Sequence, residues 1–242
     1  MRDKENIPDI LIFPEVSIPY AWIHLMARFA KKNNIGIVFG VEHITIDKIV
    51  SNYSCIMLPF KIVNHTNLFI NFDLKRHYAP VEKMEIEGYD NYVINENKAN
   101  KTALYNWRGA VFSTINCYEL TDISLRSQLI GKIDFLIAVE YNHDTNHFSN
   151  IIESTSRDIH CYVIQVNTSD YGDSRIVQPT KTEKKDIVKL KGGENIYVVI
   201  HDIDIKKLRD FQMQNHCMQS KNDKGIFKLT PPHFQVSESR RE

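Results

Sequence analysis

The chain has 242 residues, of which 43% are hydrophobic and 25% charged, and its 30 lysines and arginines balance 30 aspartates and glutamates. This neutrality argues against binding of nucleic acid through a general basic surface, and the aliphatic and aromatic content excludes an intrinsically disordered chain. No apolar run reaches the roughly 20 residues of a membrane span, and the N-terminus has no signal-peptide pattern. Composition therefore predicts a cytoplasmic globular protein with no membrane partner.

The four cysteines at positions 55, 117, 161 and 217 are widely scattered. They form no CxxC pair and have no histidine at metal-ligand spacing, so neither a disulfide framework nor a structural zinc site is expected. Taken singly, each cysteine is predicted to be a small buried hydrophobic residue. No cofactor and no metal are predicted.

Strand and helix patterns alternate over the first forty residues. Residues 9–13 (DILIF) form a β-branched run that Pro14 ends, and residues 35–41 (IGIVFGV) form a second apolar run. Between them, residues 21–33 have helical spacing of Trp22, Leu25, Met26, Phe29 and Ala30. This order predicts a βαβ unit, with strands that are buried beneath helices.

The rest of the chain continues the alternation. Strands are predicted at 54–58 and 67–72 (joined around Pro59), 110–115, 135–139, 161–166, 174–178 and 196–201, and helices at 124–130, 146–158 and 206–213. Two polar stretches, 88–101 and 179–195, are predicted to be surface loops. The tail from Ser237 is expected to be frayed, so one domain is assigned to residues 1–236 and the tail to 237–242.

Three segments carry chemistry-bearing side chains. Glu15 follows the first strand in LIFPEVSIP, Lys75, His77 and Glu82 lie in FDLKRHYAPVE, and Cys117 ends a strand in STINCYELTD. A carboxylate at the carboxyl end of a strand lies at the edge where α/β proteins place their sites. A thiol at a strand-to-helix junction can be activated as a thiolate by the helix N-terminus and neighbouring groups. Each residue alone is equally compatible with an ordinary surface or core position.

The order of these segments resembles the carbon–nitrogen hydrolase (nitrilase-like) superfamily. The family places its Glu, Lys and Cys after three successive strands, and this chain has the same order in strand-FPE, strand-KRHxxP and strand-CYE. Three later segments resemble the elements that follow in the family, namely FLIAVEYNHDT, residues 153–179 and GGENIYVVIHDIDIKKLRDF. The resemblance covers nearly the whole chain. It implies an α/β fold of the α-β-β-α sandwich type, which forms four layers and which pairs into dimers through helix faces.

The resemblance also implies roles for individual residues. Cys117 would be the nucleophile and form a thioester, and Glu15 would be the general base. Lys75 would stabilise the oxyanion together with the backbone N–H of Tyr118, and Glu82 would orient Lys75. The chemistry needs these types, because only a few per cent of a thiol is ionised at neutral pH and an oxyanion needs a pre-placed cation or donor.

Substrate contacts are expected around the nucleophile and in the loop after the next strand. The residues assigned to this role are Tyr118, Glu119, Tyr141, Asn142 and His143, and the pocket walls are expected at 88–101 and 141–146. The CYE motif is similar to that of the N-acyltransferase branch of the family. That branch is embedded in membrane, whereas no membrane span is predicted here, so the substrate of that branch is not assigned to this chain. A small amide-type substrate is the implied partner.

One feature departs from the family pattern. Members usually begin with a strand and a long helix before the FPE segment, whereas this chain has about ten residues there. We therefore expect the first β–α unit to be missing from this chain and a fused upstream domain or a partner chain to supply it. A nitrilase-like domain fused to bacterial antiphage defence reverse transcriptases is the most similar group. A homo-oligomer through helix faces is also expected, and the Trp22, Met26 and Phe29 stripe belongs to the core or to such an interface.

Two alternatives to a cysteine hydrolase are open. The chain could be a specialised or catalytically idle domain for binding or assembly, attached to a reverse transcriptase or another enzyme. It could also be a metal hydrolase that uses His143, Asp144 and His147, since the two histidines have the i, i+4 spacing of one helix face. The HExxH glutamate is lacking, which disfavours the metal site.

Overall fold

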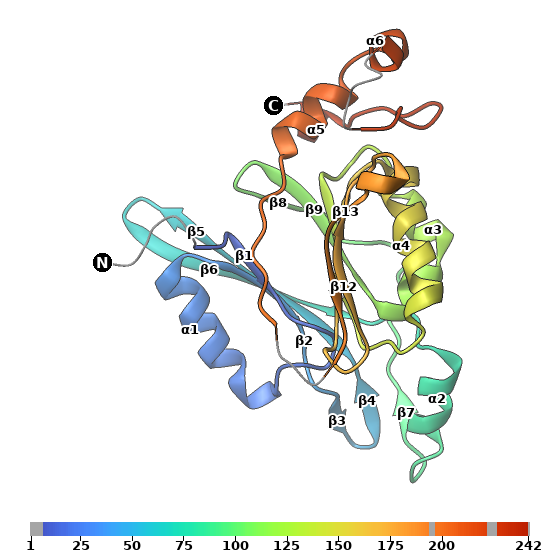
Figure 1. The fold of residues 1–242 in the computed structure, drawn as a ribbon. Coiled ribbons are helices and arrows are strands. Elements are labelled where there is room, and N and C mark those ends of the chain that lie inside the picture. Colours follow the sequence, from blue (N-terminus) through green and yellow to red (C-terminus); the bar gives the residue numbers. More distant parts are fainter. Residues whose placement is uncertain (1–6, 194–196, 222–226, 242) are drawn as a thin grey trace.

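Two β-sheets face each other in the computed structural model, which describes residues 7–193, 197–221 and 227–241 (Figure 1). The first sheet has the order β1-β2-β5-β6, formed by β1 (Ile10–Ile12), β2 (Gly36–Gly40), β5 (Tyr53–Ile62) and β6 (His65–Leu74). The second has the order β13-β12-β11-β10-β9-β8, formed by β8 (Tyr105–Trp107), β9 (Ala110–Asn116), β10 (Phe135–Glu140), β11 (Tyr162–Asn167), β12 (Gly172–Val177) and β13 (Asp186–Lys191).

Helices cover the outer faces of these sheets. Helix α1 (Ile23–Asn33) packs on the first sheet, and α3 (Ile123–Ser127) and α4 (Thr145–Ile159) lie on the second (Figure 1). The predicted α-β-β-α sandwich is therefore confirmed. The remaining elements are β3 (Ile44–Ile46), β4 (Ile49–Ser51), β7 (Val93–Ile94), α2 (Pro80–Glu87), α5 (Ile205–Gln212), α6 (His216–Lys221) and 3-10 turns at Tyr20–Trp22, Cys117–Thr121, Thr182–Lys184 and Glu238–Arg240.

The main core lies between the two sheets. Val38 and Ile56 from the first sheet meet Phe112, Ile137 and Val139 from the second, and all five are fully buried. Removal of this much aliphatic and aromatic surface from water is the main force that holds the sheets together. In the second sheet, β9, β10 and β11 run parallel. Their carboxyl ends therefore meet at one edge, where Cys117 follows β9.

The predicted βαβ unit is confirmed. Strands β1 and β2 pair in parallel, with Ile10 opposite Gly36, and α1 connects them. The stripe on α1 divides between the two expected roles: Met26 packs against the core beneath the helix, whereas Trp22 and Phe29 are 55% and 45% exposed.

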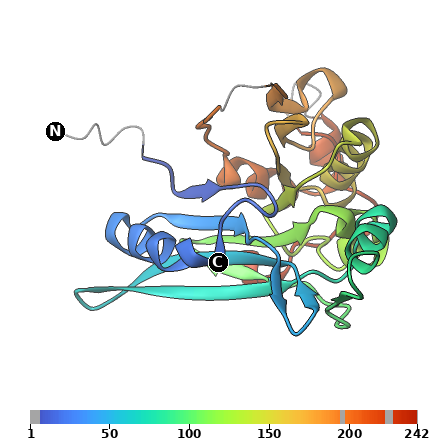
Figure 2. The ribbon, with the colours of Figure 1, turned by 90° about the horizontal axis from the view of Figure 1, so that it is seen from below.

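The segment around Pro59 differs from the prediction. Pro59 lies inside β5 and pairs with Leu68, and the hairpin turns beyond Ile62, so β5 and β6 stay paired over ten residues each. Proline is tolerated there because β2 pairs with β5 only over Ser54–Met57, so at Pro59 the strand has a partner strand on one side alone. The Pro59 carbonyl accepts a 2.7 Å hydrogen bond from the Trp107 indole in the facing sheet. Figure 2 shows the tip of this hairpin reaching beyond the neighbouring strands.

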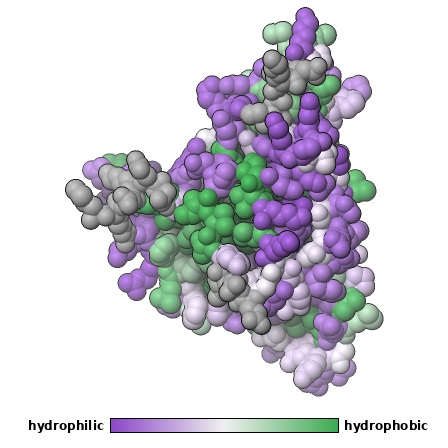
Figure 3. Space-filling model, viewed as in Figure 1, coloured by the Kyte–Doolittle hydropathy of each residue, from purple (hydrophilic) through white to green (hydrophobic). Residues whose placement is uncertain are grey.

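Two predictions for the last third of the chain are wrong. The expected loop 179–195 contains β13, an edge strand that pairs antiparallel with β12. The expected strand 196–201 is not formed over 197–201; residue 196 lies outside the described residues. Val198, 81% exposed, shows that this apolar run is not packed in a sheet. Figure 3 shows hydrophobic surface in the middle of the view, where Figure 1 places β1 and the chain leading to α5.

The C-terminal tail is packed at Arg240 instead of frayed. The Arg240 guanidinium is buried and donates to Asp134 Oδ1 at 2.9 and 3.0 Å, and Arg209 donates to the same carboxylate. Two arginines on one buried aspartate fix the tail against α5, because each hydrogen bond is assisted by charge.

The cysteines only partly follow the prediction. Cys55 and Cys161 are fully buried, as expected of small hydrophobic residues, and Cys117 is 7% exposed. Cys217, on α6, is exposed, so the prediction is wrong there. Over residues 7–193, 197–221 and 227–241, no helix has both the length and the apolar character needed to cross a membrane.

Candidate active site

Glu15 is placed at the site by a tight approach between two backbone segments. The Gly40 N–H donates to the Pro14 carbonyl at 2.9 Å, and the Gly40 carbonyl accepts from the Ser17 N–H at 3.0 Å. A Cβ atom on Gly40 would lie 2.4 Å from Glu15 Cα, so only glycine allows this approach. The Glu15 side chain is directed inward and is almost fully buried.

Lys75 directly follows β6 and is held by two carboxylates. Its Nζ lies 2.8 Å from Glu15 Oε1, and 2.9 and 2.8 Å from the two oxygens of Glu82. Burial lowers the pKa of Lys75, but attraction by Glu15, Cys117 and Glu82 outweighs burial and raises it. The ammonium also lies 4.9 Å from the centre of the Tyr78 ring. Lys75 is therefore a permanently charged, buried cation, which is rare without such partners.

Cys117 follows β9 at a sharp turn. Its φ angle is +43°, a conformation that non-glycine residues seldom adopt and that is often found at functional sites. Burial raises the pKa of its thiol well above the ordinary value, and Glu15 adds to this, whereas Lys75 opposes it. The neutral thiol is therefore favoured at rest, because the single 3-10 turn that begins at Cys117 does not offset the burial.

The structure thus brings four predicted catalytic residues together. Direct hydrogen bonds join Glu15, Lys75 and Glu82. The charges of Glu15 and Lys75 both act on the pKa of the Cys117 thiol, so the thiol lies close to this pair. They come from four separate segments, namely the chain after β1, the end of β6, α2 and the end of β9.

Asn52, which lies between β4 and β5, is a site residue that was not predicted from the sequence. Its amide Nδ2 donates to Glu15 Oε1 at 2.8 Å, and its Oδ1 accepts from Asn116 Nδ2 at 3.3 Å. The Tyr141 N–H donates to the other oxygen of Glu15 at 3.1 Å. Together these donors orient the Glu15 carboxylate. An isolated asparagine has no local signature, so only the tertiary structure could identify it.

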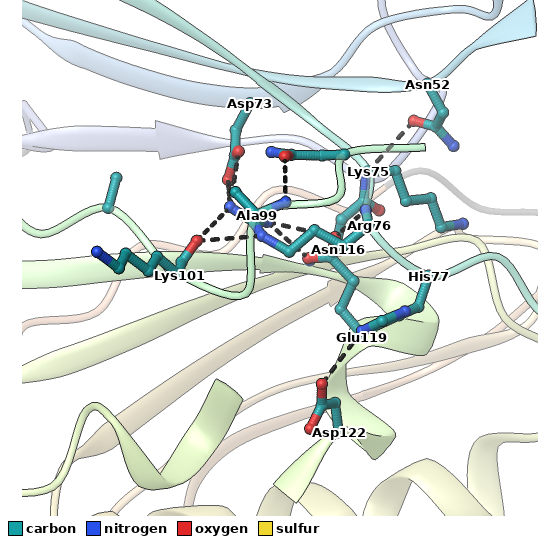
Figure 4. A network of polar contacts seen from close by, with 12 residues as sticks. Asn52, Asp73, Lys75, Arg76, His77, Ala99, Lys101, Asn116, Glu119 and Asp122 are labelled. Carbon is teal, nitrogen blue, oxygen red and sulfur yellow. Dashed lines mark hydrogen bonds and ion pairs between the residues drawn. The ribbon is translucent and has the colours of Figure 1, made fainter. Parts of the chain in front are cut away.

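Glu119 differs from its expected role in substrate binding. It accepts from the backbone N–H groups of Arg76 and Asn116, at 2.5 and 3.1 Å, and from the Arg76 guanidinium at 3.3 Å. Arg76 also binds Asp73 and the carbonyl of Lys101, and Figure 4 shows this network around Arg76, with Lys75 beside it. Because both Glu119 oxygens are occupied and buried, this residue ties the segment of Lys75 to that of Cys117.

A cavity of about 470 Å³ opens beside the nucleophile segment. It is lined by His77, Tyr78, Pro80, Lys83, Glu96, Tyr118, Thr121 and Asp122. Tyr118 therefore borders the cavity as expected of a substrate contact, and Glu96 comes from the predicted wall at 88–101. The other predicted wall, 141–146, does not border this cavity.

The three residues after β10 have different surroundings. The Tyr141 side chain is 53% exposed and its ring packs edge-on against Tyr171, which also contacts the ring of His143. Asn142 is buried, and its backbone exchanges hydrogen bonds with the Asn167 side chain at 2.9 and 2.7 Å. Asn142 therefore supports the loop, and the backbone N–H of Tyr141 contributes to the site through Glu15.

The metal-site alternative does not fit the helix boundary. Helix α4 begins at Thr145 with Asp144 as its N-cap, so His143 lies outside the helix and does not share a face with His147. The Asp144 carboxylate is used for capping, since it accepts from the His147 N–H. Within the described parts of the chain, no group of three or more histidine, cysteine, aspartate or glutamate side chains could hold a metal ion.

Comparison with known proteins identifies the fold. No family model matches the chain, and no curated protein matches its sequence. A CN-hydrolase superfamily protein from Xanthomonas campestris, with an arsenic adduct in its active site, is 13% identical, with 91% of this chain and 86% of that chain covered and a TM-score of 0.60. An amidase of the nitrilase superfamily from Nesterenkonia is 11% identical, with 76% and 74% covered and a TM-score of 0.55.

A third similar structure is Saccharomyces cerevisiae Nit3, from branch 10 of the nitrilase superfamily. It is 15% identical, with 77% of this chain and 74% of that chain covered and a TM-score of 0.54. Similarity at such low identity establishes the fold alone. This chain therefore has the α-β-β-α fold of nitrilase-superfamily proteins.

Proposed function

We propose that this chain hydrolyses a non-peptide carbon–nitrogen bond of a small amide, carbamoyl compound or nitrile, with Cys117 as the nucleophile. The observation that carries this proposal is the buried pair of Lys75 and Glu15, 2.8 Å apart, beside a thiol on a strained turn. A carboxylate, an ammonium and a thiol in one buried site provide a base, an oxyanion partner and a nucleophile. The fold supports the same reaction class, because an amidase is among its relatives.

In the first half-reaction, Glu15 takes the proton from Cys117 as Sγ attacks the carbonyl or nitrile carbon. The thiol is neutral at rest, so proton transfer and attack belong to one step, and a preformed thiolate is not required. For an amide, the tetrahedral intermediate collapses, the C–N bond breaks, and the proton held by Glu15 passes to the departing nitrogen. The product is a thioester on Cys117.

In the second half-reaction, Glu15 acts as a base again and removes a proton from water, which attacks the thioester carbon. Collapse of this second intermediate breaks the C–S bond and returns the proton to Cys117, with release of the carboxylic acid. Asn52 and the Tyr141 N–H hold the Glu15 carboxylate through both steps. The fixed orientation lowers the entropy cost of each proton transfer.

Lys75 is the group that stabilises the oxyanion of both intermediates. In the free site its ammonium contacts Glu15 and Glu82, which keep it charged and fix its direction, so Lys75 acts on the oxyanion through its positive charge. The N–H of Tyr118 is a second donor, because it lies in the first turn of the 3-10 helix, where N–H groups have no partner within the helix. Loss of one such donor raises a barrier by about 3 to 4 kcal/mol.

The test is ammonia release by the full chain from a panel of primary amides, carbamoyl compounds and nitriles. Cys117→Ala should abolish release, whereas Cys217→Ser, which removes the exposed cysteine, should leave it unchanged. Fluoroacetamide provides a second measurement, since its acetamide moiety adds to the active-site cysteine in a variant of the Nesterenkonia amidase that has one glutamate replaced by glutamine. A matching mass increase on Cys117 is expected; no release and no adduct would reject the proposal.

A second candidate function is assembly through α1. Leu25 and Phe29 on this helix and Trp22 directly before it are each about half exposed, which supports a contact with another copy of the chain. Light scattering of the purified chain, compared with Leu25→Glu and Phe29→Glu variants, tests it. A mass that stays at the monomer for every variant would exclude the homo-oligomer.

Three further proposals rest on the sequence alone, the first on composition and the other two on the family resemblance. They are a cytoplasmic location, attachment to an upstream domain, and a role with a bacterial antiphage defence reverse transcriptase. The reading frame upstream of Met1 in the genome tests the last two, because a polymerase encoded there would support them. If ammonia release depended on Cys117 while the defence phenotype did not, the domain would act by assembly in that pathway.

A further inference from the structure

Glu140 is a buried carboxyl group that the proposed mechanism does not use. It is the last residue of β10, and its side chain is completely inaccessible to solvent. In the neighbouring strand, Asn116 is opposite Val139, so Cys117 and Glu140 follow at the same level of the sheet. Adjacent strands are about 4.8 Å apart. Glu140 therefore lies next to the nucleophile.

Among the described residues, the Glu140 carboxyl accepts one direct hydrogen bond, and it comes from an uncharged side chain. Gln165 Nε2, on β11, donates to Glu140 Oε2 at 2.9 Å, which brings the two head groups together. The other oxygen of each group, Glu140 Oε1 and Gln165 Oε1, is buried and lacks a hydrogen-bond partner among the described residues, as does the amide nitrogen of Asn142. A carboxylate and an amide oxygen both only accept. One proton on Glu140 supplies the donor that this pair lacks.

The charges around Glu140 favour the same protonated form. Burial raises its pKa to about 8, and Glu15 and Asp173 add to this, whereas the amides of Gln165 and Asn142 oppose it. Cys117, on the facing 3-10 turn, is influenced in return, since Glu140 raises the pKa of its thiol. Among the residues that the structure describes, no cation forms an ion pair with Glu140, and a buried carboxylate without one is costly.

We propose that Glu140 is a positioning residue that acts as a neutral carboxylic acid: it pairs with the Gln165 amide and leaves Glu15 as the single negative charge beside Cys117. This inference rests on the proposed function, because it takes Cys117 as the nucleophile. When Glu140 ionises, a second negative charge faces the sulfur as negative charge develops there and on the oxyanion. Repulsion at this range in a protein interior slows attack by roughly tenfold or more.

The closing experiment measures alkylation of Cys117 by iodoacetamide, so it needs no substrate. The full chain carries Cys217→Ser to remove the exposed thiol, and rates at Cys117 are followed by mass spectrometry from pH 6 to pH 10. Glu140→Gln keeps the shape and the neutral state. We expect equal rates for both proteins near pH 6.5, and an advantage for Glu140→Gln that grows to at least tenfold above pH 8. A ratio that does not change with pH would overturn the proposal.

A second measurement reads the proton on Glu140 without using Cys117. The folded protein holds this proton up to about pH 8, whereas the unfolded chain releases it near the ordinary value of 4.5. Between these values the unfolding equilibrium constant of the parent should rise about tenfold per pH unit relative to Glu140→Gln. Urea titrations at pH 5, 6, 7 and 8 measure this. Glu87→Gln, an exposed carboxylate on α2, is the control and should run parallel to the parent.

The two readouts separate this inference from the proposed function. Parallel stability curves for parent and Glu140→Gln would show that Glu140 is ionised, and would overturn the inference even if the chain hydrolyses amides. Absence of amide hydrolysis, together with the expected stability and alkylation profiles, would reject the hydrolase and keep the neutral Glu140. If the stability curves are as expected but the ratio of the two alkylation rates does not change with pH, Glu140 is neutral but does not influence Cys117, and the proposed role is overturned.

Discussion

Lys75 Nζ lies 2.8 Å from Glu15 Oε1, and the two side chains are only 1% and 2% exposed. Glu82 binds the same ammonium from α2 at 2.8 Å, but its side chain remains 25% exposed. The site therefore holds one cation between a fully buried carboxylate and a partly solvated one. With a neutral thiol, its formal charge is −1, so the loss of the single cation leaves two carboxylates facing each other.

Lys75→Met should destabilise the fold strongly. Removal of one partner of a buried ion pair typically costs about 3 to 5 kcal/mol, because the remaining charge has no compensation. The double variant Glu15→Gln/Lys75→Met should recover part of this loss, since Gln needs no counter-charge. Urea unfolding of the parent, both single variants and the double variant gives the coupling energy. Additive losses would contradict a direct ion pair.

Glu82→Gln should affect turnover more than binding or stability. Glu82 accepts from Lys75 with both oxygens and from the Ala79 N–H at 3.2 Å, so it orients the ammonium and caps α2 at the same time. We expect kcat to fall by about one to two orders of magnitude with KM little changed, because Lys75 acts mainly on the transition state.

The matched control for Glu82→Gln is Glu85→Gln, which changes an exposed glutamate on the same helix. It should retain the full kcat. A Glu82→Gln enzyme with normal kcat and raised KM would instead place Glu82 in substrate binding. Equal losses for both variants would indicate a general effect on α2.

Gly40→Ala should remove activity while most of the fold persists. The added Cβ would lie 2.3 Å from Val16 N and 2.4 Å from Glu15 Cα, contacts that backbone atoms must move to relieve. A displacement of about 1 Å in a catalytic group can lower the rate by about 100-fold. Gly36→Ala, in the same strand, is the control: its Cβ would meet only side-chain atoms of Ile10 and Trp107 at 3.2 Å. Similar activity of the two variants would contradict this placement of Glu15.

The sequence predicted the strands whose hydrophobic pattern is fixed by burial on both faces. Residues 135–139 and 161–166 are continuous apolar runs because parallel strands under helices are buried on both sides, and β10 and β11 match them closely. The same rule failed at 197–201, where an apolar run stays outside the sheets. A run of this kind reports hydrophobicity but not whether a partner strand is within reach.

Only the reactive residues of the candidate site could be predicted from the sequence. Glu15, Lys75 and Cys117 stand in short segments with an ordered resemblance to a family, so the sequence could suggest them. Asn52 and Glu140 have no such context, because their roles arise from distant partners, 37 residues away for the Asn52–Glu15 bond and 25 residues away for the Glu140–Gln165 bond. Side chains that orient catalytic groups are set by tertiary contacts and carry no local pattern.

His160 gives the fold a pH dependence opposite in sign to that of Glu140. It is the buried C-cap residue of α4; its Nε2 donates to the Lys228 carbonyl at 2.8 Å, and Gln212 Nε2 lies 3.1 Å from its Nδ1. Burial lowers its pKa to about 4. The unfolded chain binds a proton at this residue near pH 6.5, whereas the folded protein does so only near pH 4.

The contribution of His160 to the free energy of unfolding should therefore fall as the pH drops from 6.5 to 4. Between these values the unfolded state binds more protons, so the free energy of unfolding decreases by about 1.4 kcal/mol per pH unit, to a total of about 3 kcal/mol. His160→Asn removes the titrating group and keeps a residue that tolerates the left-handed conformation, φ +57°, of this C-cap. Urea unfolding at pH 7, 5.5 and 4.5 should show a smaller acid loss for this variant.

The His160 experiment needs a control because Glu140 acts over an overlapping pH range. From pH 4.5 to 6.5 the Glu140 carboxyl raises stability as the pH falls, so the two effects partly cancel in the parent chain. In the Glu140→Gln background the loss at His160 should be fully visible, at about tenfold per pH unit in the unfolding constant. His24→Gln, on the exposed side of α1, should leave the profile unchanged. An acid loss that persists in Glu140→Gln/His160→Asn would assign it to another group.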